Sequence, residues 1–167
     1  MTRSSPAWTL SLALLALALL APLAGCGGGG GSGDPEPLLA GNVSGALDNE
    51  TFTAVNGFAV VGADSHTLIG VGDGPLNCAS PDQPDPPPGM MASISLPSDA
   101  VGTYGSVMIT VYVNRSGFQG VGSNDGTVEI TASTPESIAG SVSYSASPGG
   151  EHTVSLNGTF EVVRCAD

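Results

Sequence analysis

The sequence predicts an all-β protein, either an antiparallel β-sandwich or a barrel-like sheet of about eight strands. Two observations favour this fold. From about residue 38 onward, short segments rich in Val, Ile, Thr, Phe and Tyr alternate with Gly, Pro, Asn and Asp. Over the same region, no stretch repeats its apolar residues with the period of an amphipathic helix. The chain of 167 residues is long enough for one domain with one hydrophobic core.

The first 25 residues have the composition of an export signal. Arg3 is the single basic residue before Arg115, and an apolar run rich in leucine and alanine occupies residues 7–23. This run is short for a membrane-spanning helix, which needs about 20 apolar residues. It ends in Pro22 and small residues, as a cleavable segment does. The alternative is an uncleaved N-terminal anchor that contains a cysteine by chance.

The residues Leu23-Ala24-Gly25-Cys26 resemble the lipobox of bacterial lipoproteins. The resemblance implies cleavage after Gly25, acylation of Cys26 with palmitate or related chains, and membrane attachment through that lipid. Gly27 stands where an aspartate favours inner-membrane retention in the enteric pattern, so the resemblance implies the outer membrane. We therefore expect a protein of the cell envelope.

Residues 26–37 are expected to form a flexible spacer behind the lipid. Five consecutive glycines are followed by Ser32-Gly33-Asp34-Pro35-Glu36-Pro37, a composition that cannot bury enough apolar area to fold. The run is not a phosphate-binding loop, because the Gly-Lys-Ser/Thr ending of that motif is missing. The predicted organisation is a signal peptide (1–25), the lipidated cysteine with its spacer (26–37) and a β-domain (38–167).

Turn-forming residues divide the β-domain into predicted strands. We expect strands at residues 42–47, 51–61, 66–71, 91–96, 106–114, 127–132, 137–146 and 152–163. The Asn-Gly pair at 56–57 is either a tight hairpin turn or a bulge. Residues 102–104 are expected as a turn, and residues 147–150 give the clearest hairpin. The Asn-Gly pair at 157–158 is interpreted as a bulge in one long last strand.

The clearest alternation lies in residues 106–114. One face carries branched aliphatic residues and the other is only partly polar, which predicts a central strand: Val107, Ile109, Val111 and Val113 against Met108, Thr110 and Tyr112. Residues 72–89 form the longest predicted loop, because the prolines at 81–88 cannot donate ladder hydrogen bonds. A partner could dock on this proline run, but an exposed, stiffened loop is the favoured interpretation.

Three short motifs lie in the second half of the chain. They are Gly-Thr-Tyr at 102–104, Gly-Thr-Val-Glu-Ile at 126–130 and Gly-Thr-Phe at 158–160. In this respect the second half resembles small bacterial lipoprotein domains of unknown function. The resemblance implies a β-fold on a lipid anchor, and it assigns no catalytic residue.

Cysteine usage predicts one disulfide. With Cys26 assigned to the lipid, Cys78 and Cys165 remain as a pair. An exported chain lies in an oxidising compartment, which favours a bond between the C-terminus and the long loop. Closing so long a loop contributes roughly 4–5 kcal/mol in the chain-entropy model. Two free buried thiols are the alternative; neither cysteine has the close partner of a redox or zinc motif.

Acidic residues dominate the composition. There are 15 Asp and Glu against 3 Lys and Arg, for a net charge of −12. This charge disfavours nucleic acid and anionic lipid surfaces as partners. The lipid on Cys26 is therefore the predicted membrane contact, and a protein or glycan partner is left unspecified. A solvated acidic surface or divalent cations fit the charge better.

Patterns for catalysis and metal binding are weak. His66 and His152 lie far apart, and no serine has the context of a nucleophile elbow, so a hydrolase has the least support and we expect no cofactor. Asp73, Asn124 and Asp125 are weak calcium candidates, because acidic loops supply the oxygen ligands that calcium prefers. The same residues are ordinary turn formers. The sequence favours a structural or binding module, with a calcium- or small-ligand-binding β-domain as the alternative.

Overall fold

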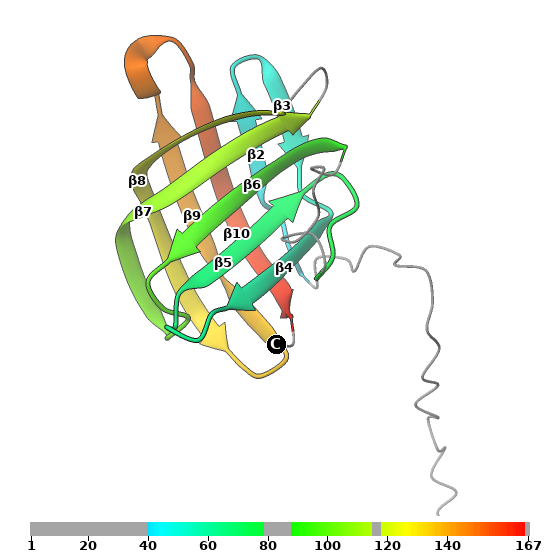
Figure 1. The fold of residues 1–167 in the computed structure, drawn as a ribbon, viewed down its shortest axis with the longest axis vertical. Coiled ribbons are helices and arrows are strands. Elements are labelled where there is room, and N and C mark those ends of the chain that lie inside the picture. The colour runs from blue at the N-terminus through cyan, green and yellow to red at the C-terminus, as the bar shows by residue number, and fades with distance from the viewer. Residues whose placement is uncertain (1–39, 79–87, 115–117, 166–167) are drawn as a thin grey trace, which may run out of the picture. The chain divides into compact units, whose positions relative to one another are not determined.

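Strands occupy most of the described chain, as Figure 1 shows. The structure is a computed structural model that describes residues 40–78, 88–114 and 118–165. The predicted signal peptide, Cys26, the spacer and residues 81–87 of the proline run lie outside these ranges. The strands are β1 (Ala40–Gly41), β2 (Ser44–Leu47), β3 (Glu50–Thr53), β4 (Asn56–Val61), β5 (Thr67–Gly72), β6 (Gly89–Leu96), β7 (Gly102–Asn114), β8 (Phe118–Ser133), β9 (Ser137–Ala146) and β10 (Val154–Arg164), with a short 3-10 turn, η2 (Pro148–Gly150), before β10.

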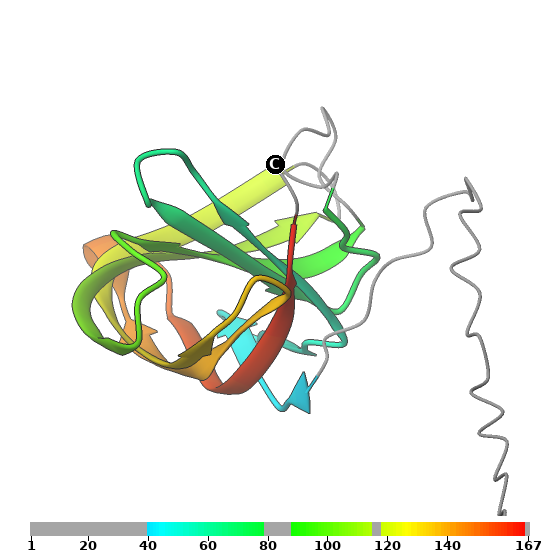
Figure 2. The same ribbon diagram turned by 90° about the horizontal axis from the view of Figure 1, so that it is seen from below.

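Seven of these strands close into a barrel. From β4 to β10 each strand pairs antiparallel with the next one in the chain. β10 then pairs in parallel with β4, where Val163 lies opposite Phe58 and Arg164 opposite Ala59. Figure 2 looks into the ring that results. The all-β prediction is confirmed, and of its two forms the barrel-like sheet is the one that this chain adopts.

The three N-terminal strands extend the barrel wall beside β10. β2 pairs with the first residues of β10, from Val154 to Asn157, and β1 pairs with Phe160 and Glu161. β3 forms a hairpin with β2 and contributes the last strand on that side. In Figure 2 these strands, in cyan, lie next to β10, in red. The strands β8, β9, β10, β2 and β3 consequently form one continuous antiparallel sheet.

Alternate side chains of every barrel strand fill the interior. On β7, Val107, Ile109 and Val111 are buried, whereas Met108 is 42% exposed, so the predicted alternation of this strand is confirmed. Aliphatic residues supply most of the core, together with Phe52, Phe160 and other members of a single buried cluster that spans β2 to β10. These side chains fill the interior of the described part of the barrel.

Several local predictions were wrong, because strands pair with residues that are far away in the sequence. Residues 51–61 divide into β3 and β4, and the Asn-Gly pair at 56–57 opens β4 with Gly57 buried. Residues 102–104 begin β7 and pair with residues 128–130 of β8. β8 starts at residue 118, earlier than the predicted 127. At residues 157–158 the register between β9 and β10 is unbroken, so there is no bulge toward β9.

Gly158 marks a change of partner along β10. It lies between the residues that pair with β2 and those that pair with β1, and its φ is +134°. A Cβ at this position would lie 2.7 Å from the carbonyl oxygen of Asn42. Glycine is therefore required by both the backbone conformation and the close approach of the neighbouring chain.

Candidate functional site

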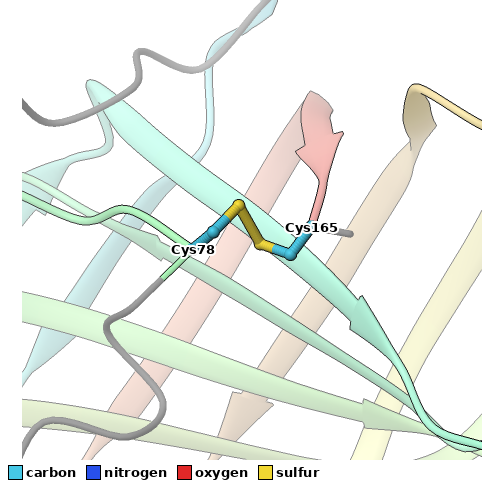
Figure 3. The surroundings of a disulfide bond; sticks show 2 residues. All are labelled: Cys78 and Cys165. Atoms are coloured by element: carbon cyan, nitrogen blue, oxygen red, sulfur yellow. A yellow bond between two sulfur atoms is a disulfide. The ribbon is translucent and has the colours of Figure 1, made fainter. Parts of the chain in front are cut away.

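Cys78 and Cys165 form the disulfide that the sequence predicts. Their Cα atoms are 5.3 Å apart, although 87 residues separate them in the chain. Figure 3 shows the bond between the end of β10 and the segment that follows β5. Cys165 also donates its backbone N–H to the carbonyl oxygen of Ala59 at 2.8 Å, next to the parallel pairing of β4 and β10. The disulfide thus reinforces the point where the barrel closes.

A small second core lies under the segment that the disulfide holds. Phe58 points out of the barrel, and Leu76 covers it together with Cys165. All three are buried, and Leu76 has no exposed surface. Val60, Met91 and Val163 pack around them. We call Phe58, Leu76, Cys165, Val60, Met91 and Val163 the outer cluster. Its role is structural, because it buries apolar surface that the barrel interior cannot take.

Asp73, one of the calcium candidates, is engaged in shaping this segment. Its carboxylate accepts the backbone N–H of Met90 at 2.8 Å, and its own N–H bonds the Met90 carbonyl oxygen at 3.1 Å. The side-chain amide of Asn56 donates to the carbonyl oxygen of Gly74 at 2.9 Å. These bonds connect the end of β5 to the start of β6 and to β4.

The other two calcium candidates lie within β8. Asp125 accepts a hydrogen bond from the hydroxyl of Ser123 at 2.7 Å, and that hydroxyl also lies 3.2 Å from the phenol oxygen of Tyr144. Asn124 and Asp125 lie where the register between β7 and β8 shifts. Among the described residues, no three His, Cys, Asp or Glu side chains gather in a way that could hold a metal ion.

The two histidines occupy separate turns. Nδ1 of His152 lies 2.9 Å from Oδ2 of Asp48, and the other carboxylate oxygen of Asp48 accepts the backbone N–H of Thr153. The pKa of Asp48 is lowered, chiefly by the hydrogen bond from the backbone N–H of Thr153 and next by the hydrogen bond with His152. His66 donates its backbone N–H to Asp64. Neither histidine bonds a serine hydroxyl within the described residues, so the two turns offer no nucleophile–base pair.

A half-buried polar link at one end of the barrel was not predicted from the sequence. Arg164 donates from Nη2 to the carboxylate of Asp99 and to the hydroxyl of Ser133, which itself bonds Asp99 at 3.0 Å. Burial acts to raise the pKa of Asp99, but the hydrogen bonds from Arg164 and Ser133 outweigh it and leave the pKa lowered. The link joins β10, the end of β8 and the turn between β6 and β7. In the sequence, only the rarity of arginine pointed to Arg164 as a residue of interest.

One surface of the barrel is a field of small polar side chains. It covers the outward positions of the continuous sheet, between inward residues that are buried. Ten of these outward residues are serine or threonine, and none is basic or aromatic. We call this set the hydroxyl face: Thr127, Glu129, Thr131, Ala139, Ser141, Ser143, Ser145, Ser155, Asn157, Thr159, Glu161, Ser44, Ala46, Thr51 and Thr53.

Strand register arranges these side chains in rows. One row crosses all five strands of the sheet and carries a hydroxyl or amide at every position: Thr127, Ser143, Asn157, Ser44 and Thr53. Neighbouring rows are separated along each strand by two residues, about 7 Å, and neighbouring strands by about 4.8 Å. The face is therefore a regular lattice of hydrogen-bonding groups.

Shallow depressions follow this lattice because its side chains are short. One of about 390 Å³ lies over β8, β9 and β10, and Glu129 and Glu161 are among its lining residues. A second of about 300 Å³ lies over β2, β3 and β10. A third of about 260 Å³ lies near the turn that carries Asp48. Within the described residues, the hydroxyls of Ser141, Ser145 and Ser155 bond no other residue, so they are available to an external partner.

The sequence does contain a pattern that indicates this face, namely polar residues at every second position, but serine and threonine are common throughout the chain. Serine recurs at every second position at 141, 143 and 145, and polar residues recur in the same way from 155 to 161. The lateral register that assembles these strands into one surface is not visible in the sequence.

Comparison with protein-family models, with curated proteins and with solved structures gives no match to this chain. Within the described residues, no helix qualifies as a candidate membrane span.

Proposed function

We propose that this protein is a lipid-anchored module of the bacterial cell envelope with a structural or binding role. The observation that carries the proposal is the segment Leu23-Ala24-Gly25-Cys26 behind an apolar run and a single basic residue. The disulfide between Cys78 and Cys165 supports it, because structural disulfides form in the oxidising compartments to which exported proteins travel.

The lipid on Cys26 would supply the membrane affinity. Each buried methylene contributes about 0.8 kcal/mol, so one acyl chain holds a protein only marginally and two or more hold it stably. The glycine-rich residues after Cys26 would let the β-domain move relative to the bilayer, since such linkers behave as flexible coils. Placement in the outer membrane is part of the proposal and rests on Gly27.

Binding at the surface fits this barrel better than carriage of a ligand inside it. The inward residues form one packed cluster, whereas the depressions lie on the outer wall. The calcium alternative has less support, since no described group of acidic side chains could hold the ion. We expect superimposable melting curves with calcium and with chelator; a higher melting temperature with calcium would revive the alternative.

The anchor is tested by labelling the full chain with palmitate in a bacterial host. We expect incorporation into the wild type and none into Cys26→Ala, because that thiol is the proposed acylation point. Fractionation should move the Cys26→Ala protein from the membrane pellet to the soluble fraction. Intact mass of the wild type should correspond to a chain that starts at Cys26.

The matched control is Cys78→Ala/Cys165→Ala, which removes the other two cysteines and should keep the label. The proposal fails if the wild type takes up no palmitate or if Cys26→Ala sediments with membranes as the wild type does. The choice of membrane is tested by density-gradient separation of the membranes. The wild type should be found in the outer-membrane fraction, and Gly27→Asp should not.

A further inference from the structure

We propose that the hydroxyl face binds a glycan strand that carries free amino groups. This inference deepens the proposed envelope role by naming the chemistry of the partner. Three observations carry it: the lattice of hydroxyl and amide groups, the depressions that follow it, and two carboxylates in the depression over β8, β9 and β10.

The hydrogen-bonding groups of the face match a polyhydroxylated partner. Serine and threonine hydroxyls both donate and accept, as sugar hydroxyls do, so pairs can form along the length of a strand. The side chains of Ser141, Ser145 and Ser155 are not committed to other described residues, whereas the amide of Asn157 bonds Ser143 and the carbonyl oxygen of Tyr144. Several weak bonds distributed along a shallow surface suit an extended polymer better than a compact ligand, which needs a deeper pocket.

The backbone of this sheet argues against a peptide as the occupant. An extended peptide binds a sheet by pairing with an unpaired strand edge. Around the depressions, β9, β10 and β2 have paired neighbours on both sides, whereas β1 and β3 are edge strands within the described residues. Over its centre the face therefore offers side chains alone, which is the mode of contact that sugars use, and a peptide could pair only at the β1 and β3 edges.

Charge selects the kind of glycan. Glu129 on β8 lies opposite Ser141 of β9, and Glu161 on β10 lies opposite Ala139 of β9. By strand spacing, the backbones of the two glutamates are about 12 Å apart on either side of β9. Both line the same depression, and the face has no basic side chain. An amino group between these carboxylates would be attracted to both, whereas a phosphate or carboxylate would be repelled.

The experiment uses the full chain in detergent and titration calorimetry with soluble oligomers of three kinds. These are glucosamine oligomers, N-acetylglucosamine oligomers, and oligomers of a uronic acid. We expect the glucosamine oligomers to bind best, the N-acetylated ones more weakly, and the uronic acids not at all. Added salt should weaken glucosamine binding, because its ion pairs lie at an exposed surface.

Two pairs of variants separate a specific site from the general attraction of an acidic protein for amines. Glu129→Gln/Glu161→Gln should weaken glucosamine binding by about tenfold, which is what two exposed ion pairs together supply. Asp64→Asn/Glu151→Gln removes the same charge from turns outside the face and should bind as the wild type does. Ala139→Tyr fills the depression over β8, β9 and β10 and should abolish binding. Ser95→Tyr places the same side chain at an exposed position of β6, outside the face, and should leave binding unchanged.

The proposal is overturned if no oligomer binds, if uronic acids bind as well as glucosamine, or if both charge-removing variants lose affinity equally. Thermal melting checks that each variant is folded, and Thr131→Tyr replaces Ala139→Tyr if the latter is not. Because Cys26→Ala retains the whole face, its binding to glucosamine separates failure of the anchor from failure of the glycan site.

Discussion

The barrel has two outer surfaces that follow the same strand alternation with opposite chemistry. Outside β4, the outward residues Phe58 and Val60 are apolar, and a segment pinned by the disulfide covers them. On the hydroxyl face the outward residues are short and polar, and the depressions there stay open. Water can satisfy hydroxyl groups but not a phenyl ring, so only the first surface requires a cover. The difference indicates that one side of the wall serves stability and that the other is left open to solvent.

The largest expected effect comes from removing the disulfide. Cys78→Ala/Cys165→Ala should lower the free energy of unfolding by roughly 4–5 kcal/mol, because the bond closes a long loop. Urea denaturation of the variant, and of the wild type with and without reductant, measures this cost. A change below about 1 kcal/mol would mean that the cover over Phe58 holds without its covalent link.

Leu76→Ala tests the outer cluster while the disulfide stays in place. The side chain is fully buried against Phe58, so its truncation should cost about 2–4 kcal/mol. The matched substitution on the other surface is Thr53→Ala, an exposed residue of the hydroxyl face, which should cost within about 0.5 kcal/mol. Equal costs for the two variants, measured by urea denaturation, would contradict the distinction between the surfaces.

A smaller effect concerns the acid stability of the Arg164–Asp99 link, which adjoins the disulfide. The folded-state pKa of Asp99 is below its ordinary value of 3.8. Its contribution is therefore present above that value and is lost as the pH falls through the folded-state pKa. Asp99→Asn should be less stable than the wild type at neutral pH, and the difference should shrink under acid conditions. Melting temperatures across this pH range provide the measurement; a constant difference would show that the charge of Asp99 is not involved.

Features that depend on the local sequence pattern were predictable, whereas features that depend on pairing between strands were not. Alternation with a period of two residues identified β6, β7 and β9, because one face of each strand lies in the core. The first half of β8 was missed because glycines such as Gly120 interrupt its pattern. A Cβ at Gly120 would lie 2.5 Å from the Tyr112 ring, so a partner on β7 dictates the residue. Closure of the barrel depends on Val163 meeting Phe58, a contact that no local window contains.

The candidate site was less predictable than the fold. Counting cysteines was enough to pair Cys78 with Cys165, since only one pairing was left. Asp73 and Asp125 were identified as calcium candidates. In the structure the carboxylate of Asp73 accepts a hydrogen bond from Met90, and that of Asp125 accepts one from Ser123. The hydroxyl face requires five strands in a known register, and residues from 44 to 161 contribute to it. Its individual serines resemble any solvent-facing residues until that register is known.

The parallel pairing of β10 with β4 has a consequence for biogenesis. Val163 and Arg164 stand at the end of the last strand, so β4 has no closing partner until this C-terminal part of the chain is present. Until then the ring has an open seam, and a product stopped short of residue 163 could not seal it. Premature termination or proteolytic trimming by a few residues should therefore leave an aggregation-prone open barrel with a bare edge on β4, not a slightly weakened barrel.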